Sequence, residues 1–101
     1  MGTINQKYRI MTEKDLLLME FRQKCYGIME WIIREYENLS CSVRATSRGS
    51  FTCVMHARGG IGDEIVDSEA QKFYLSDTRH EMIEKYDLLT QFIWQNGDKS
   101  E

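Results

Sequence analysis

The sequence has 101 residues but contains no proline, only two histidines and only three cysteines. Without proline, no position is barred from the hydrogen-bond ladder of a helix or strand, so long uninterrupted elements are expected. No stretch approaches the roughly 20 apolar residues of a transmembrane helix, and the N-terminus lacks the basic-then-apolar pattern of a secretory signal. The sequence therefore predicts a single small intracellular domain with no membrane segment.

The cysteines, Cys25, Cys41 and Cys53, are odd in number and show no C-x-x-C spacing. This pattern argues against both a disulfide framework and a zinc site, and it favours a reducing compartment. We expect Cys41 to lie four residues from the position opposite Cys53, which makes a bridge between them unfavourable. No metal and no cofactor is expected.

Charge is distributed unevenly along the chain. Residues 1–38 carry six basic and six acidic side chains, residues 39–62 carry three arginines and no acid, and residues 63–101 carry ten acids and four bases. The three balances of 0, +3 and −6 give the net charge of −3. Such segregation predicts one surface that attracts anions and another that repels them, unless the charges are simply dispersed as solvated side chains.

A long helix is predicted to begin at Thr12 and to end between Asn38 and Ser40. Thr12 and Asp15 have the spacing of a capping box, and apolar residues then recur every three or four positions. These residues are Leu18, Phe21, Cys25, Ile28, Met29, Ile32, Tyr36 and Leu39. The helix would be about 40 Å long, longer than a domain of this size needs, so we expect a second copy of the chain to pack against it.

Three strands and a second helix are predicted to follow. Residues 41–47 and 51–58 alternate like strands, and residues 71–76 form the third strand. The second helix begins at Thr78, which has capping-box spacing to Glu81, and stops at Gly97.

The predicted fold class is therefore α+β. It is a two-layer αβββα arrangement with a three-stranded antiparallel sheet packed on two helices. Residues 1–11 are assigned to an N-terminal arm or edge strand, residues 12–96 to the single domain, and residues 97–101 to a polar tail.

The parity of the first hairpin decides which of its side chains are buried. An odd-numbered loop centred on Gly49 pairs Cys53 with Ala45 and gathers the apolar residues on one face. A five-residue loop is an open alternative, because Gly49 does not occupy the last position of a three-residue loop.

The stretch 57–64 holds three glycines within four residues, a density that phosphate-binding loops also show. No strand–loop–helix unit surrounds these glycines, no Gly-Lys-Ser/Thr follows, and Asp63 and Glu64 would repel phosphate. The sequence therefore predicts a turn between strands, which could also serve as a mobile contact loop.

Five side chains are predicted to share the outer face of the sheet. They are Arg44, His56, Arg58, Lys72 and Tyr74. Arginines beside an aromatic ring can hold phosphates and stack a base, so this face is a candidate site for nucleic acid or a nucleotide. A plain solvated face is the alternative.

The predicted element order is similar to that of double-stranded-RNA-binding domains, but the similarity ends at topology. The last helix lacks a basic N-terminal cluster and instead carries Asp77, Glu81, Glu84 and Asp87. A shared order of elements predicts no function by itself.

We do not expect an enzyme. The two histidines, His56 and His80, fall on different predicted elements, and no catalytic motif is recognisable. The nearest arrangement is a metal-independent RNA-cleaving site in which His56 is the general base, beside Arg58 and Tyr74.

The leading functional prediction is a small non-enzymatic protein that binds and blocks another macromolecule, as inhibitors, immunity proteins and phage counter-defence proteins do. It depends on small size, charge segregation, excess apolar helix surface and the lack of a catalytic motif. Trp31 and Trp94 lie at the margins of their apolar stripes and are the candidate interface residues for a protein partner or a homodimer. Binding of nucleic acid or a nucleotide through the outer sheet face is the alternative.

Overall fold

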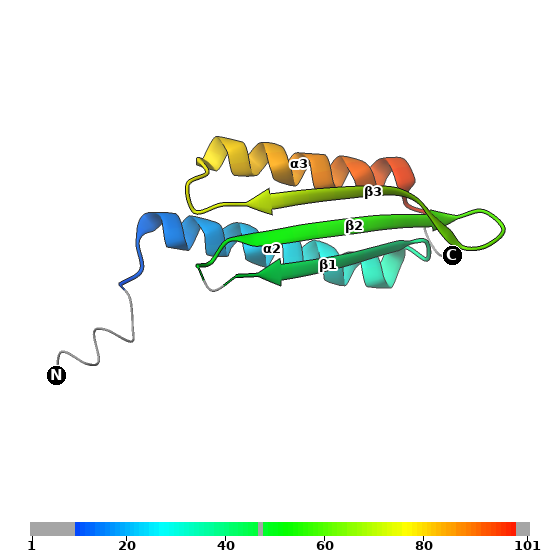
Figure 1. Cartoon of the computed structure of the whole chain (residues 1–101), viewed down its shortest axis with the longest axis horizontal. Coiled ribbons are helices and arrows are strands. Elements are labelled where there is room, and N and C mark those ends of the chain that lie inside the picture. Colours follow the sequence, from blue (N-terminus) through cyan, green and yellow to red (C-terminus); the bar gives the residue numbers. More distant parts are fainter. Residues whose placement is uncertain (1–9, 47, 99–101) are drawn as a thin grey trace.

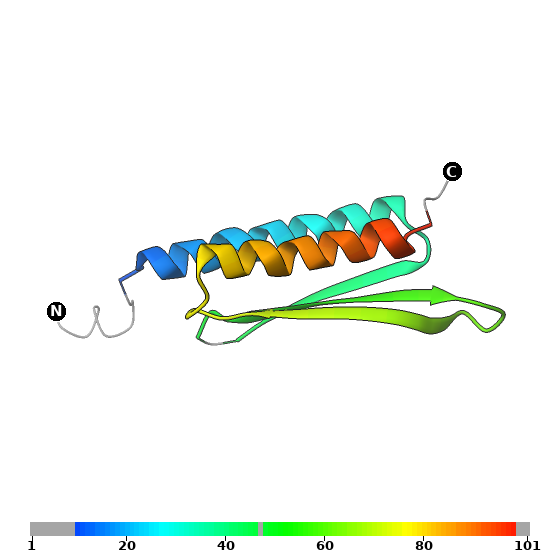
Figure 2. The ribbon, with the colours of Figure 1, turned by 90° about the horizontal axis from the view of Figure 1, so that it is seen from above.

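Five elements follow one another in the computed structural model, which describes residues 10–46 and 48–98. They are α2 (Glu13–Glu35), β1 (Leu39–Ala45), β2 (Phe51–Gly59), β3 (Glu64–Phe73) and α3 (Arg79–Asn96) (Figure 1). The strands form an antiparallel sheet in the order β1-β2-β3, and both helices lie on one side of it (Figure 2). The predicted α+β arrangement is confirmed. Residues 1–9 of the predicted arm and residues 99–101 of the predicted tail lie outside the described residues.

Both helices begin where the sequence predicts. At α2, the Thr12 hydroxyl accepts a hydrogen bond from the Asp15 amide at 3.1 Å, and the Asp15 carboxylate accepts one from the Thr12 amide at 2.9 Å. Thr78 and Glu81 form the same reciprocal pair at α3, at 3.1 and 3.0 Å. Each capping box satisfies amide groups that the start of a helix leaves without partners.

The predicted C-terminal end of the first helix, between Asn38 and Ser40, is wrong. The helix ends at Glu35, before Asn38, because Tyr36 has an extended backbone with φ −126° and ψ 124°. Asn38 then turns the chain into β1: its side-chain amide donates to the Asn96 carbonyl at 2.7 Å, and its oxygen accepts from the Asp98 amide at 2.8 Å. These two hydrogen bonds join the α2–β1 turn to the end of α3 and to the residues that follow it.

The first hairpin has the predicted parity, but its register differs by two residues. Cys53 lies opposite Val43 rather than Ala45, because the five-residue loop, residues 46–50, is centred on Arg48 rather than on Gly49. The five-residue length is the alternative that the sequence leaves open, but the predicted centre at Gly49 is wrong, and β1 begins and ends two residues earlier than predicted. A shift by an even number of residues leaves every side chain on its predicted face.

The third strand is longer than predicted. The sequence indicates residues 71–76, whereas β3 begins at Glu64 and ends at Phe73. The first part of β3 is exposed almost throughout, so no alternation of apolar and polar residues marks it. A register shift interrupts the pairing of β2 with β3 between Ala57 and Arg58.

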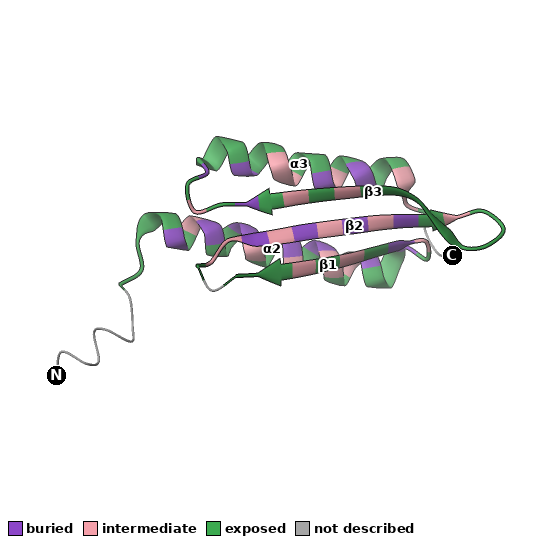
Figure 3. Ribbon diagram, in the orientation of Figure 1, coloured by how far each residue is buried: buried purple, intermediate pink, exposed green. Residues whose placement is uncertain are grey.

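The core lies between the inner face of the sheet and the helices, and β2 runs through its centre (Figure 3). The inward residues of β2 are almost completely buried: Phe51, Cys53, Met55 and Ala57. The Phe51 and Phe73 rings stack with centroids 4.6 Å apart, and Phe21 of α2 lies 6.2 Å from Phe73. Burial of each large apolar side chain contributes about 1.5–3 kcal/mol to the stability of the fold. Because this face of the sheet packs on the helices, the other face is left to solvent.

Candidate binding surfaces

Four of the five predicted site residues occupy outward positions of the sheet, Tyr74 follows the end of β3, and the five fall into two groups. Arg44 and Lys72 both pair with Thr52, so they flank it in one row across the sheet. Tyr74 follows the end of β3, and its ring centroid lies 5.3 Å from the Lys72 ammonium group. These three residues form one group.

The second group lies further along β2. The His56 Nδ1 atom is 2.7 Å from the Ser68 hydroxyl, and the Arg58 guanidinium donates to the Asp63 carbonyl at 3.3 Å. Six residues separate Thr52 from Arg58, a distance of about 20 Å along a strand. The fold therefore does not bring Tyr74 to His56, as an RNA-cleaving site built from both would require.

The outer face contains no acidic side chain over its paired rows. Its outward residues are Ser40, Ser42 and Arg44 of β1, Thr52, Val54, His56 and Arg58 of β2, and Ile65, Ser68, Ala70 and Lys72 of β3. The acids of β3 pair with inward positions of β2: Asp67 lies opposite Ala57, and Glu69 lies opposite Met55. In a protein of net charge −3, this segregation creates a cationic face of mostly small side chains.

The end of the β2–β3 hairpin, residues 59–66, is here called the hairpin tip. Figure 2 shows that it projects beyond the ends of both helices. Ile61 at its turn is fully exposed, and Ile65 and Val66 are 49% and 64% exposed. The turn is made by Gly60 and Asp63, both with positive φ, which confirms the predicted turn. In the sequence, Ile65 and Val66 stand out only as a short apolar step, and nothing there shows that they face solvent.

A hollow of about 600 Å³ lies at the opposite end of the sheet, where three segments meet. We call it the loop-end hollow. It is lined by Lys14 of α2, Arg48 and Ser50 of the β1–β2 loop, and Tyr74, Leu75 and Ser76 after β3. Sequence reasoning singles out only Tyr74 of these residues, because the three segments are far apart in the chain.

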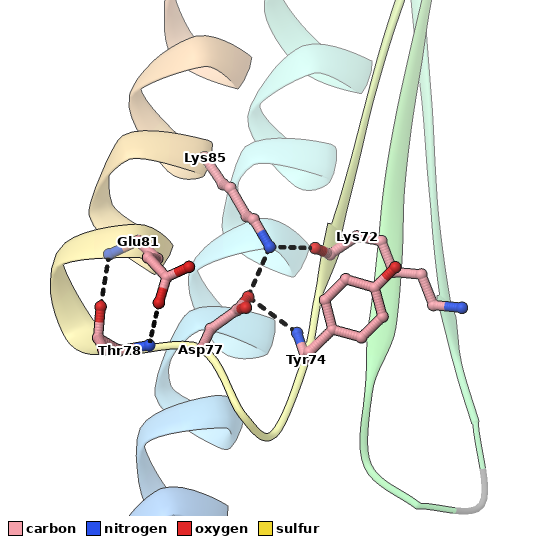
Figure 4. A network of polar contacts seen from close by, with 6 residues as sticks. All are labelled: Lys72, Tyr74, Asp77, Thr78, Glu81 and Lys85. Carbon is pink, nitrogen blue, oxygen red and sulfur yellow. Dashed lines mark hydrogen bonds and ion pairs between the residues drawn. The ribbon is translucent and has the colours of Figure 1, made fainter.

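A polar network holds Tyr74 in place (Figure 4). The buried Asp77 carboxylate accepts a hydrogen bond from the Tyr74 amide at 3.0 Å and pairs with the Lys85 ammonium group at 2.6 Å. Lys85 also donates to the Lys72 carbonyl at 2.7 Å, and its ammonium group lies 4.9 Å from the Tyr74 ring centroid. The ring is therefore presented by a rigid turn rather than by a loose loop.

The two predicted interface residues, Trp31 and Trp94, contact each other on the helix layer. Their rings meet edge to face with centroids 5.9 Å apart, and Trp31 also meets the Tyr36 ring at 5.3 Å. Trp31 is half-buried, whereas Trp94 is 68% exposed. Trp31 thus serves mainly to pack α2 against α3, and Trp94 offers most of the free ring surface.

The cysteines lie closer together than the sequence predicts. Cys41 is two residues, not four, from the position opposite Cys53, and their sulfur atoms are 3.6 Å apart, although all three thiols are free. A hydrogen bond with Cys25 raises the pKa of Cys53 to about 12, and a hydrogen bond with Cys53 raises the pKa of Cys41. Thiols that ionise so weakly are poor nucleophiles. Within residues 10–46 and 48–98, no group of three or more His, Cys, Asp or Glu side chains could hold a metal ion.

Comparison with known proteins identifies no relative: no family model matches the chain, and no curated protein or solved structure matches it. Neither helix in the described part of the chain has both the length and the apolar character that a bilayer span requires. The functional argument therefore depends on the surfaces described above.

Proposed function

We propose that this chain is a non-enzymatic interaction protein that binds and blocks another macromolecule, and that the hairpin tip makes the contact. The observation that carries this proposal is the exposure of Ile61, Ile65 and Val66 on a projecting hairpin. These side chains contribute nothing to the core. Exposed apolar residues at the end of a sheet promote association, and proteins usually avoid them where no partner is to be bound.

The charge of the hairpin tip indicates the chemistry of the partner. Asp63 and Glu64 accompany the apolar residues, Asp67 follows them, and none of the three forms an ion pair with a described residue. An acidic and apolar projection fits a basic cleft with an apolar floor. Clefts that hold nucleic acid have this character, so occupation by the tip would exclude the nucleic acid. Inhibitors, immunity proteins and phage counter-defence proteins offer the analogy.

The test compares two matched substitutions in the full chain. Ile61→Asp changes the hairpin tip, and Ile33→Asp changes an isoleucine of α2 that is also well exposed. Each variant is used to capture partners from an extract of the native host, with and without nuclease. We expect capture of one protein, insensitive to nuclease, and about 30-fold weaker binding for Ile61→Asp alone, which corresponds to about 2 kcal/mol at a central contact. Equal capture by both variants, or loss only with Ile33→Asp, would show that the tip is not the contact.

A second candidate function is binding of nucleic acid by the acid-free outer face. Arg44 and Lys72 flank one row of the sheet there, and Arg58 lies further along β2. Such binding should weaken steeply as salt increases, and Arg44→Ala or Lys72→Ala should each reduce the slope of log K against log salt by about 1. Arg34→Ala, which removes a charge from α2, is the control. A slope near zero excludes this function.

We also propose that the chain forms a homodimer through the helix layer and acts in a reducing compartment. Trp94 remains exposed on α3, which supports the first proposal, and three free thiols support the second. Sedimentation equilibrium at tens of micromolar protein should give the mass of a dimer for the wild type and of a monomer for Trp94→Ala. A monomeric wild type contradicts the dimer.

A further inference from the structure

The loop-end hollow has the size of a small-molecule site and draws its walls from three separate segments. Its volume of about 600 Å³ lies within the range of about 300–1,000 Å³ that ligand pockets occupy. Figure 1 shows that the start of α2, the β1–β2 loop and the turn before α3 all lie at this end of the molecule. The hollow is widely open to solvent.

The lining of the hollow is cationic and contains no acid. Lys14 and Arg48 both contribute to it, and neither forms an ion pair with a described residue. Two carboxylates lie near, but the fold engages both. Asp15 accepts hydrogen bonds from Thr12 in the capping box, and Asp77 binds Lys85 and the Tyr74 amide. An anion in the hollow would therefore meet two cations and no competing negative side chain at its surface.

The apolar part of the lining includes the aromatic ring of Tyr74, whose backbone is fixed by hydrogen bonds. Tyr74 is 45% exposed, and its backbone is fixed on both sides: its amide donates to Asp77, and its carbonyl accepts from the Asp77 amide at 3.0 Å. Leu75 lies beside it in the lining. A ring held in this way can stack on a planar ligand with little loss of conformational entropy.

We propose that the loop-end hollow binds a mononucleotide, with its phosphates on Lys14 and Arg48 and its base on Tyr74. The guanidinium of Arg48 can form two parallel hydrogen bonds to phosphate oxygens, and Lys14 adds a second positive charge. The ammonium group of Lys72 lies 5.3 Å from the Tyr74 ring centroid, whereas the charge of Lys85 is balanced by its ion pair with Asp77. This site is distinct from the hairpin tip and does not depend on the function proposed for it.

The experiment is a calorimetric titration of the full chain with ATP, with adenosine and with inorganic phosphate at fixed ionic strength. ATP should bind at least about tenfold more tightly than either fragment, because only ATP engages the cations and the ring together. Equal binding of ATP and inorganic phosphate would reduce the site to a general anion site and overturn the proposal, as would equal binding of adenosine.

Variants assign the binding to the hollow. Arg48→Ala and Lys14→Ala should each weaken ATP binding by about tenfold, as expected for a lost charge-assisted contact. Tyr74→Phe keeps the stacking surface and should retain affinity, whereas Tyr74→Ala should lose it. Arg34→Ala removes the same charge from the exposed surface of α2 and is the matched control. Equal losses for Arg34→Ala and Arg48→Ala would mean that only net charge matters, and the proposed site would be wrong.

Discussion

At one end of the sheet, the loop-end hollow is lined by Lys14, Arg48 and Tyr74, and the ion pair of buried Asp77 with half-buried Lys85 fixes its turn. At the other end, the hairpin tip projects into solvent with its apolar and acidic side chains exposed. The first end is cationic and held by hydrogen bonds from several elements. The second is anionic and depends on the pairing of two strands alone.

This difference shows how one small domain can carry two unlike surfaces. The helices cover one face of the sheet but do not extend over the hairpin tip. The part of β2 under the helices therefore contributes to the stability of the fold, whereas its end at the hairpin tip is exposed to solvent. Changes at the loop end should therefore affect folding as well as binding, whereas changes at the tip should affect binding alone. Four predictions test this contrast.

The largest effect is expected from Asp77 at the loop end. Asp77→Ala leaves both the Lys85 ammonium group and the Tyr74 amide without their partner, which should lower the free energy of unfolding by about 2–4 kcal/mol. Asp67→Ala, in the exposed part of β3, is the matched control and should cost less than about 0.5 kcal/mol. Urea denaturation measures both. Equal losses would remove the distinction between the two ends.

A smaller effect is expected from the glycine that closes α3. A Cβ atom at Gly97 would lie 2.4 Å from Cδ1 of Tyr36 and 2.8 Å from the Ile93 carbonyl. Gly97→Ala should therefore destabilise the fold by about 1–3 kcal/mol through overpacking. Gly62→Ala at the hairpin tip meets only the flexible Glu64 side chain, at 3.4 Å, and should change stability little. A tolerated Gly97→Ala would show that Tyr36 can move aside.

The third prediction concerns the middle of the sheet, which joins the two ends. The pKa of Cys53 is raised from 9.0 to about 12 in the folded protein, so the unfolded chain loses the thiol proton first as pH rises. The stability due to the neutral thiol is complete below pH 9 and is lost as pH rises towards 12, with a loss of about 1 kcal/mol at pH 10. Urea denaturation at several pH values should show this decline, and Cys53→Ala should decline less steeply. Parallel curves would contradict the assignment.

The smallest effect is expected from the Glu20–Arg79 ion pair, which joins the two helices at 3.1 Å. The hydrogen bond from Arg79 holds the pKa of Glu20 below its ordinary value of 4.5. A lowered folded pKa contributes stability above the unfolded value, and that contribution is lost as pH falls through the folded value. Glu20→Gln should thus be slightly less stable than the wild type at pH 7 and equal to it in strong acid. Because both side chains are exposed, the difference is small; Glu30→Gln, which removes a pair within α2, is the control.

Local chemistry made much of the fold predictable. The sequence predicts both helix starts, because a capping box needs only two residues three positions apart. The two pairs are Thr12 with Asp15 and Thr78 with Glu81. Alternation along β2 likewise predicts the parity of the first hairpin. It does not predict its register, because loops of three and five residues bury the same face. The first part of β3 escaped prediction since an exposed strand has no apolar alternation to reveal it.

The candidate sites were predictable only in part. Arg44, His56, Arg58 and Lys72 share one face because parity alone assigns faces, but the distance that divides them depends on the pairing of three strands. Lys14 and Arg48 could not be associated with Tyr74 from the sequence, since long separations along the chain carry no local signal.

The sequence by itself determined where the helices begin, which face of β2 is buried and how unevenly charge is distributed, because each depends on neighbouring residues or on a simple period. Only the tertiary structure decided that three distant segments line a cationic hollow and that an apolar, acidic hairpin extends past the helices. Those features depend on the length of the loops, on the strand register and on how far each packed element extends. Contacts between residues far apart in the sequence determine all three.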